Sequence, residues 1–362
     1  MREGWAVRKR SLHGTSVGIV ANPASGRDVR RLVARASVFP LAEKCNIITR
    51  LLSALGAVGI ERVLLMRDAG GITDRLQRVL VSHADTESWP EVLFVDMVVE
   101  DGPNDTTRAV EQMVRAGVEA IVVLGGDGTH RLVASACGEI PVMALSTGTN
   151  NVFPEIREAT VAGMAAGLVA SGRVCKVEAT RRNKILDVAI DGVVRAQALV
   201  DVSVSCEEWV GSKALWRPET LSQIFVTFAE SDAIGLSSVA GLVQPVSRSA
   251  RHGLCIEIAP PGAARMTVEA PIAPGLIVPV GVASVSEIYP GKPQCLGVRQ
   301  GVIALDGERE IEFRSGQQVR VQLSNTGPFT IDTRRVMSLA AQKGLLVDAQ
   351  LEQENIRTKI AG

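Results

Sequence analysis

The sequence predicts an α/β domain with a parallel sheet, followed by an antiparallel, β-rich second domain. Nearly all-apolar segments alternate with amphipathic segments up to about Gly172, and Asp-Gly pairs with many Gly and Pro turns dominate the rest. The chain has 362 residues, 46% of them hydrophobic, which is enough for roughly two domains with separate cores. The predicted boundaries are 1–172 for the α/β domain, 173–333 for the β-rich domain and 334–362 for a helical tail that packs back on the first domain.

The first half of the chain contains two kinds of segment. Short, nearly all-apolar runs predict strands, and amphipathic runs between them predict helices, because their apolar residues recur at the spacing of one helix face. Strands that are apolar throughout, with helices between them, indicate a parallel sheet covered on both faces. The predicted strands are Val17–Ala21, Val63–Met66, Val92–Val98, Ala120–Leu124 and Val142–Leu145, and the predicted helices are Ala42–Leu55, Ile72–Val81 and Thr106–Ala116.

After Gly172 the pattern indicates antiparallel strands. Asp191-Gly192 and Asp306-Gly307 each stand between two apolar segments, and Asp-Gly favours the type I′ turn of a tight hairpin. The predicted strands are Lys184–Ile190, Val193–Val200, Leu254–Ala259, Met266–Ala270, Leu276–Val282, Val302–Leu305, Arg309–Phe313 and Val319–Leu323. Helices are predicted at Pro218–Phe228, at Ser237–Val243 and, with a break at Gly344, from Arg334 to about Lys359.

Composition limits the classes of partner. Lys+Arg and Asp+Glu number 39 each, so the net charge is zero, and no basic block indicates nucleic acid or a membrane surface. Aromatic residues make up 3%, too few for stacking on single-stranded nucleic acid. No apolar stretch approaches the roughly 20 residues that span a bilayer, and the apolar run after the basic segment Met1–Gly14 is too short for a signal peptide. The six cysteines lack paired spacing, which indicates reduced thiols in a cytoplasmic protein.

The most informative stretch is the glycine-rich run from Gly125 to Thr129. The predicted strand Ala120–Leu124 leads into three glycines around Asp127, and a helix-like segment, Arg131–Cys137, follows. Glycine lets backbone N–H groups approach an anion and adopts positive φ, and a helix start adds partial positive charge, so this is the layout of a phosphate-binding turn. Because a carboxylate repels phosphates, we expect Asp127 to bind a cation or to accept a proton from an attacking group.

Three polar clusters follow three predicted strands of the first domain. Each alone has the composition of an ordinary turn, but the carboxyl ends of parallel strands share one edge of the sheet, where ligands bind. Hydroxyls, amides and free backbone N–H groups suit the phosphates and ribose of a nucleotide. The clusters are Asn22-Pro23-Ala24-Ser25-Gly26, Gly125 to Thr129, and Ser146-Thr147-Gly148-Thr149-Asn150-Asn151.

Two nucleotide-binding fingerprints are absent from the sequence. The P-loop pattern G-x-x-x-x-G-K-[ST] does not occur, because Gly211-Ser212-Lys213 has the wrong order and no glycine upstream. The dehydrogenase pattern G-x-G-x-x-G is not completed either, since Thr129-His130-Arg131 follows Gly126-Asp127-Gly128. A dehydrogenase is therefore the least favoured hypothesis.

The combination of N-P-x-S-G, G-G-D-G-T and G-T-x-N resembles the superfamily of NAD kinases, diacylglycerol kinases and sphingosine kinases. The wider sequence, from Asn22 to Ala34 and from Ala36 to Lys44, resembles the AcoX family of ATP-NAD kinase-like proteins, which are encoded with acetoin-catabolism genes. The resemblance covers most of the chain and implies that nucleotide binds between an α/β domain and a β-sandwich domain. It also implies ATP or another NTP with Mg²⁺, NAD as an alternative ligand, and a homo-oligomer.

Carried over residue by residue, the family motifs imply roles for particular side chains. The residues implied to bind the nucleotide are Asn22, Ser25, Gly26, Gly125, Gly126, Gly128, Thr129, Thr147, Gly148, Thr149 and Asn151. The residues implied in catalysis are Asp127, at the reacting end of the phosphates, and Asp306 and Glu308, which fall on the D-G-E of the lipid kinases, where they act as general base and supporting group. The motifs leave the metal ligands unidentified.

The acceptor site departs from both branches of the superfamily. Val152 stands where lipid kinases continue G-T-x-N with Asp. NAD kinases carry an Asn-Glu or Asn-Asp pair for the acceptor ribose, and the nearest pair here is Asn150-Asn151. The identity of the acceptor is therefore not implied by the resemblance.

Each candidate side chain also has a structural interpretation. Asp127 would suit the N-cap of the following helix, and Asp306 would suit a type I′ turn for its geometry alone. Glu308 shares a charged face with Glu310, as in a solvated strand edge. His130, at the positive start of a helix, would be held neutral. It could donate to a phosphate oxygen, but a structural hydrogen bond is the favoured use.

Two functions are predicted from these features. The first is an NTP-dependent kinase that transfers phosphate to a hydroxyl of a small molecule such as NAD(H), with Mg²⁺ at the phosphates, Asp127 orienting the metal or the acceptor, and Asp306 as the base. The second, motivated by the altered acceptor residues, is a non-catalytic nucleotide- or NAD(H)-binding protein that serves acetoin metabolism as an accessory or regulator.

Overall fold

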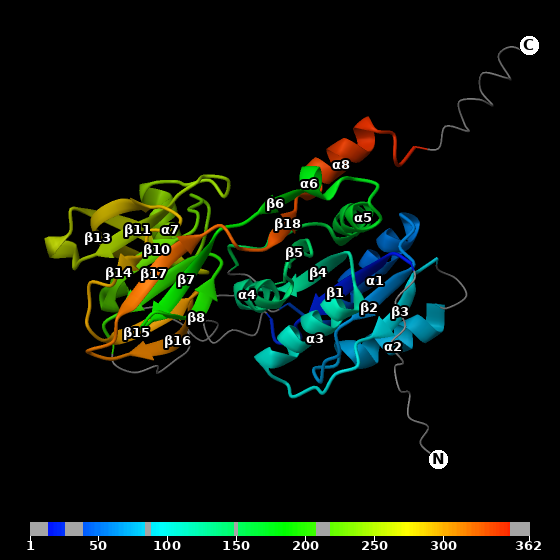
Figure 1. Ribbon diagram of the computed structural model, residues 1–362, viewed down its shortest axis with the longest axis horizontal. Coiled ribbons are helices and arrows are strands. Elements are labelled where there is room, and N and C mark those ends of the chain that lie inside the picture. Colours follow the sequence, from blue (N-terminus) through cyan, green and yellow to red (C-terminus); the bar gives the residue numbers. More distant parts are fainter. Residues whose placement is uncertain (1–13, 26–38, 84–87, 148–150, 208–217, 348–362) are drawn as a thin grey trace, which may run out of the picture.

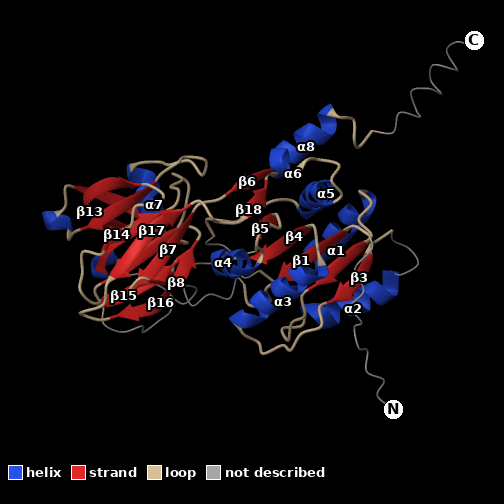
Figure 2. Cartoon of the chain, viewed as in Figure 1, coloured by secondary structure: helices blue, strands red, loops and turns tan. Residues whose placement is uncertain are grey.

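The computed structural model describes residues 14–25, 39–83, 88–147, 151–207 and 218–347, which form two lobes side by side (Figure 1). The first lobe combines helices with a sheet, and the second consists almost entirely of strands (Figure 2). Among the described residues no helix is both long and apolar enough to cross a membrane. The predicted site residues Gly26, Gly148 and Thr149 lie outside the described part of the chain.

The first lobe is built on a seven-stranded sheet with the order β3-β2-β1-β4-β5-β18-β6. All neighbouring strands from β3 to β18 pair in parallel, and β6 pairs antiparallel with β18. This confirms the parallel α/β sheet that the apolar strands predict. The strands are β1 (Ser16–Ala21), β2 (Arg62–Leu65), β3 (Glu91–Phe94), β4 (Ala120–Gly125), β5 (Val142–Ser146), β6 (Thr180–Arg182) and β18 (Phe329–Ile331).

Helices cover both faces of this sheet, so each strand is buried on both sides. Successive side chains of β1 point to opposite faces, and Ile19 and Val20 accordingly belong to two different core clusters. The Ile19 cluster includes residues of α1 (Leu41–Ala57), α2 (Ile72–His83), α5 (Ala159–Ala170) and α8 (Thr333–Gln342). The Val20 cluster includes residues of α3 (Pro103–Ala116) and α4 (Asp127–Ala136), and a single turn, α6 (Lys176–Ala179), precedes β6.

The second lobe is an antiparallel sandwich. A seven-stranded sheet, β12-β13-β11-β10-β9-β15-β16, shares a core with a four-stranded sheet, β14-β17-β7-β8, and α7 covers the other face of the larger sheet. The elements are β7 (Ile185–Ile190), β8 (Val193–Ala198), β9 (Asp201–Ser205), β10 (Leu221–Val226), α7 (Ser237–Val243), β11 (Gly253–Ile258), β12 (Met266–Ala273), β13 (Leu276–Ile288), β14 (Gln294–Cys295), β15 (Gly301–Leu305), β16 (Glu308–Phe313) and β17 (Val319–Ser324).

Two features differ from the sequence-based prediction. The predicted helix Pro218–Phe228 is wrong, because a 3₁₀ turn at Pro218–Thr220 leads into β10. Its apolar residues are close together because β10 is a central strand buried on both faces, and that pattern also fits a buried helix. The strands β6 and β18 lie within the range predicted as the second domain, yet they complete the first sheet, so the second lobe is inserted between them.

The helix α8 lies at the start of the predicted tail and packs on the first lobe, and residues 348–362 of that tail lie outside the described part of the chain. Its residues Val336, Leu339 and Ala340 are buried in the same cluster as α1 and α5. Gly344, two residues beyond the helix end, has a φ of 62°, which agrees with the predicted break.

Close contact between α1 and α5 depends on glycine. A Cβ atom on Gly167 would lie 2.3 Å from Cγ2 of Val58, which follows α1 directly, and one on Gly163 would lie 2.8 Å from Cβ of Ala54. We expect Gly167→Val to lower the free energy of unfolding by about 1–3 kcal/mol, because overpacking forces neighbouring side chains to move. Urea denaturation measures this change.

Gly262→Val is a matched control, because no atom lies within 4 Å of the Cβ position of Gly262. We expect that variant to change the stability by less than about 0.5 kcal/mol. Equal losses in the two variants would contradict the packing argument.

Candidate functional site

The three polar loops of the first lobe meet at one edge of its sheet. Asn22 follows β1 directly, and its Nδ2 donates a hydrogen bond of 2.8 Å to Oγ1 of Thr129 in the glycine-rich loop. The hydroxyls of Ser25 and Thr147, from the first and third loops, lie 2.8 Å apart. Side chains from three distant segments therefore form one connected polar group, as the strand ends predict.

The first two glycines of the G-G-D-G-T motif allow close packing of side chains. A Cβ atom on Gly125 would lie 2.5 Å from Cβ of Thr129, and one on Gly126 would lie 2.8 Å from Oδ1 of Asn151. Asn151 also donates to the hydroxyl of Ser146 at 2.8 Å. Neither glycine has a positive φ, and nor does Gly128. The loop therefore needs glycine for space, and the expected positive φ is not found.

The helix α4 starts directly after this loop, and its first turn faces Glu308. Gly126 occupies the N-cap position and has no side chain with which to cap the helix. The first N–H groups of a helix have no acceptor within it, so this end has partial positive charge and donors for an anion. A Cβ atom on Gly128 would lie 3.6 Å from Oε1 of Glu308, which places a carboxylate of the second lobe beside the start of α4.

Asp127 connects the glycine-rich loop to the third loop. It is the first residue of α4, so it does not act as the N-cap. Its carboxylate accepts hydrogen bonds from the backbone N–H of Val152, at 3.0 and 3.1 Å, and of Phe153, at 2.8 Å, and the residue is only 8% exposed. The side chain thus fixes the chain that leaves the third loop.

Arg248 of the second lobe holds the same two residues from their carbonyl side. Its guanidinium donates to the carbonyl oxygens of Val152, at 2.6 Å, and Phe153, at 2.8 Å. The same group pairs with the carboxylate of Glu230 at 2.8 and 2.9 Å. No spacing in the sequence indicates this contact, because Arg248 lies in a loop far along the chain.

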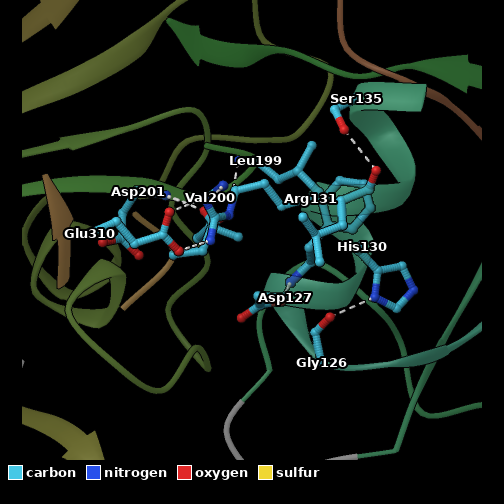
Figure 3. Close-up of polar contacts among 12 residues, drawn as sticks. Gly126, Asp127, His130, Arg131, Ser135, Leu199, Val200, Asp201 and Glu310 are labelled. Atoms are coloured by element: carbon cyan, nitrogen blue, oxygen red, sulfur yellow. Dashed lines mark hydrogen bonds and ion pairs between the residues drawn. The ribbon is translucent and has the colours of Figure 1, made fainter. Parts of the chain in front are cut away.

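Asp306 forms the turn between β15 and β16 and bonds to the neighbouring strand. The φ values of Asp306 and Gly307 are 49° and 82°, as expected for the predicted type I′ turn. The carboxylate is fully buried and accepts hydrogen bonds from the N–H groups of Leu199, Val200 and Asp201 at 2.8 to 3.2 Å. Figure 3 labels these three donor residues. The turn geometry and these bonds together account for an Asp at this position.

Arg131 of α4 forms ion pairs with acidic residues of the second lobe. Its Nε lies 3.5 Å from Oδ2 of Asp306, and its terminal nitrogens form a bidentate pair with Glu310, one bond being 2.9 Å. Burial raises the pKa of Asp306 to about 6, although Arg131 and the three N–H groups favour the charged form. This ion pair joins the two lobes beside the candidate site.

His130 points away from Arg131 (Figure 3) and is buried. Its Nδ1 lies 2.9 Å from the carbonyl oxygen of Gly126, so Nδ1 carries the proton and donates. Burial lowers the pKa of the imidazole to about 4. The neutral ring packs 5.9 Å from the ring of Phe153, and the structural hydrogen bond predicted for His130 is present.

Lys44 of α1 supports the first loop, although none of the three sequence motifs includes it. The residue is fully buried, and its Nζ donates to the carbonyl oxygens of Asn22, Pro23 and Ser25 at 2.8, 3.0 and 2.8 Å. A signal was present in the sequence, because Lys44 stands on the apolar face of its helix, four residues before Ile48. A lysine at such a position needs buried acceptors.

Comparison with known proteins agrees with this architecture. Residues 17–174 match the ATP-NAD kinase N-terminal domain, and residues 184–326 match the acetoin catabolism protein X C-terminal domain. The chain is therefore a two-domain protein with an NAD kinase-like first domain.

The acetoin catabolism protein X of Cupriavidus necator is 46% identical to this chain over 335 residues, covering 91% of this chain and 93% of that protein. The chain belongs to the acetoin catabolism protein X family, which confirms the resemblance in its motifs. A solved Xaa-Pro dipeptidase with bound methionine is 12% identical, with a TM-score of 0.17 over 44% of this chain and 41% of that chain, and this likeness has no bearing on fold or function.

Removal of the buried ammonium group should loosen the first loop. We expect Lys44→Met to lower the free energy of unfolding by at least about 1–3 kcal/mol, because it leaves buried carbonyl oxygens without their donor. Chemical denaturation measures the loss. Lys343→Met is the control, since Lys343 forms an exposed ion pair with Glu178 at 3.4 Å, and such pairs contribute about 0–1 kcal/mol. Similar losses in both variants would contradict the role of Lys44.

His130 should make stability depend on pH. In the folded protein it stays neutral down to about pH 4, whereas a histidine of unperturbed pKa 6.5 is protonated below that value in the unfolded chain. The unfolded state binds more protons in this window, so stability is lost as the pH falls from about 6.5 through 4. Between pH 7 and pH 5 the free energy of unfolding should fall in both proteins, and we expect the fall to be about 1–2 kcal/mol smaller in His130→Gln than in the wild type. Parallel unfolding curves at the two pH values test this, and identical losses would contradict it.

Proposed function

We propose that the protein is a nucleotide-dependent phosphotransferase that moves a phosphate group from ATP or another NTP to a hydroxyl of a small molecule, in the manner of NAD kinases. One observation supports this most directly: three polar loops of an NAD kinase-like domain converge at the uncapped start of α4. The name of the Cupriavidus necator relative, acetoin catabolism protein X, supports a place for the reaction in acetoin catabolism.

The start of α4 suits a phosphate chain. The N–H groups of Gly128 and Thr129 lie in the first turn of the helix, where donors and partial positive charge are available to an anion. The hydrogen bond between Asn22 and Thr129 keeps the first loop against this turn. In the proposal these backbone groups bind the phosphates, and the polar side chains fix the loops that present them.

A divalent cation would resolve an electrostatic conflict in this site. The carboxylate of Glu308 lies beside the same helix start and would repel a phosphate bound there. Mg²⁺ is commonly held by one or two carboxylates together with substrate phosphates. Among the described residues no group of three or more His, Cys, Asp or Glu could hold a metal, so we assign most ligands of Mg²⁺ to the nucleotide and one to Glu308. The ion would neutralise charge on the transferred phosphate.

The three candidate acids receive different roles in this proposal. Asp127 and Asp306 accept hydrogen bonds from backbone N–H groups and hold the loops and strands of the site. The carboxylate of Glu308 has no hydrogen bond among the described residues and is partly exposed. We therefore propose that Glu308 contacts the metal or the acceptor hydroxyl, while Asp127 and Asp306 position the site.

A second candidate function is nucleotide or NAD(H) binding without catalysis, in an accessory or regulator of acetoin metabolism. The observation that favours it is the use of the Asp127 and Asp306 carboxylates in internal hydrogen bonds. In addition, Val152 occupies the place of an acidic residue, and its N–H is bonded to Asp127.

Substitution of Glu308 tests the kinase proposal. We expect Glu308→Gln to slow phosphate transfer by about 10²–10⁴-fold, because a positioned acid or base contributes that much, with stability changed by less than about 0.5 kcal/mol. Transfer of labelled phosphate from ATP to NAD, NADH and small alcohols measures the rate. Asp306→Asn should instead lower the free energy of unfolding by about 1–3 kcal/mol. An unchanged rate in Glu308→Gln would remove Glu308 from the mechanism.

Calorimetry separates the two candidate functions. Titration with ATP, NAD and NADH, each with and without Mg²⁺, reports binding to the wild-type protein. Binding without transfer to any acceptor would favour the regulator. If none of the nucleotides binds, both proposals fail.

A further inference from the structure

A cavity of about 220 Å³ lies where the two lobes join, outside the three polar loops. Residues of β5, β6 and β18, the start of α8 and the chain after the third loop line it, and Arg248 reaches it from the second lobe. Its lining contains four arginines and two carboxylates: Arg157, Arg181, Arg248, Arg334, Glu155 and Asp332. The cavity therefore has an excess of positive charge.

Some of these charges are balanced within the protein. Arg157 pairs with Glu155 at 2.8 Å, and Arg248 pairs with Glu230, which lies outside the lining. Asp332 accepts a hydrogen bond from the N–H of Arg335 at 2.9 Å and thereby caps α8. Even with Glu230 counted, the four arginines exceed the three carboxylates by one positive charge.

Arg181 is the arginine of this cavity that has an unsatisfied hydrogen-bond donor. Its Nε is buried and has no hydrogen-bond partner among the described residues. Burial lowers the pKa of its guanidinium, and the neighbouring charge of Arg248 lowers it further, against the attraction of Asp332, Glu155 and Glu230. Two guanidinium groups that face one cavity repel each other, and a buried N–H group without an acceptor is costly. An anion between them would remove both penalties.

Further donors line the same cavity. Thr333 and Arg334 are the first two residues of α8, a ten-residue helix whose first N–H groups have no acceptor within the helix. The hydroxyl of Thr330 accepts a hydrogen bond from Nδ2 of Asn183 at 2.9 Å, so its own proton is available to another acceptor. Donors thus approach the cavity from β6, β18, α8 and the second lobe.

We propose that this cavity binds a phosphate group, as free phosphate or as a small phosphate monoester, with Arg181 as its principal ligand. A tetrahedral oxyanion offers several oxygens to donors that approach from different sides, and arginine binds phosphate through two parallel hydrogen bonds. The volume, about 220 Å³, is below the roughly 300 Å³ at which ligand pockets for larger molecules begin, so it suits a small anion better than a nucleotide. The site is separate from the proposed nucleotide site.

Calorimetry with inorganic phosphate and with glycerol phosphate, at constant ionic strength, tests this site. We expect Arg181→Gln to weaken binding of phosphate about tenfold or more, because it removes a charged hydrogen-bond donor. Arg334→Gln, at the exposed helix start, should weaken binding of phosphate several-fold. This variant tests the site if Arg181→Gln does not fold. Arg335→Gln is the matched control, because Arg335 is exposed on the same helix and does not line the cavity. The affinity of this variant for phosphate should stay within about twofold of the wild-type affinity.

Thermal unfolding gives a second readout. At one phosphate concentration, added phosphate should raise the melting temperature of the wild type more than that of Arg181→Gln, while in phosphate-free buffer the variant should melt no lower than the wild type. Tighter binding of glycerol phosphate would identify a monoester as the ligand, and equal or weaker binding would identify free phosphate.

Absence of binding would overturn the proposal, as would equal weakening in Arg335→Gln. Competition with excess ATP would also overturn it, because the phosphate would then occupy the loops at α4. None of these outcomes depends on whether the protein transfers phosphate.

Discussion

The arrangement of the site depends on how the two residues after the third loop are held. Val152 and Phe153 donate their N–H groups to Asp127 of the first lobe, and their carbonyl oxygens accept from Arg248 of the second. The backbone N–H and C=O groups of two consecutive residues are all bonded to charged side chains, which make stronger hydrogen bonds than neutral groups. The start of α4, the chain that follows the third loop and the second lobe are consequently held to one another.

Buried charge determines which side chains remain available for chemistry. Asp127, Asp306, Arg131 and Lys44 each meet several polar partners inside the protein, because a buried ion without partners would be expensive. Glu308 is at the edge of this network and adjoins the uncapped helix. The difference in burial thus explains why these four charged side chains support the structure, whereas the carboxylate of Glu308 is accessible.

Much of the architecture could be predicted from the sequence, because continuous apolar strands, Asp-Gly turns and the G-G-D-G-T motif are local signals. The two hairpin turns, the parallel sheet and the contacts between the loops are present as expected. The strand β10 was not predicted, since a strand buried on both faces has no alternation to distinguish it from a helix. Arg248 and Arg131 could not be assigned, because their partners are brought near only by the association of the two lobes.

The position of the second lobe between β6 and β18 bears on the order of folding. Asn183 and Pro328, at the two crossings between the lobes, are joined by a hydrogen bond of 3.0 Å from the N–H of Asn183 to the carbonyl oxygen of Pro328. Closing so long a loop in an unfolded chain has a large entropic cost, and a folded insertion removes most of it by bringing its own ends together. The last two strands of the first sheet are thus added most readily after the sandwich has formed. Folding of the second lobe, which is synthesised later, therefore promotes completion of the sheet in the first lobe, which is synthesised earlier.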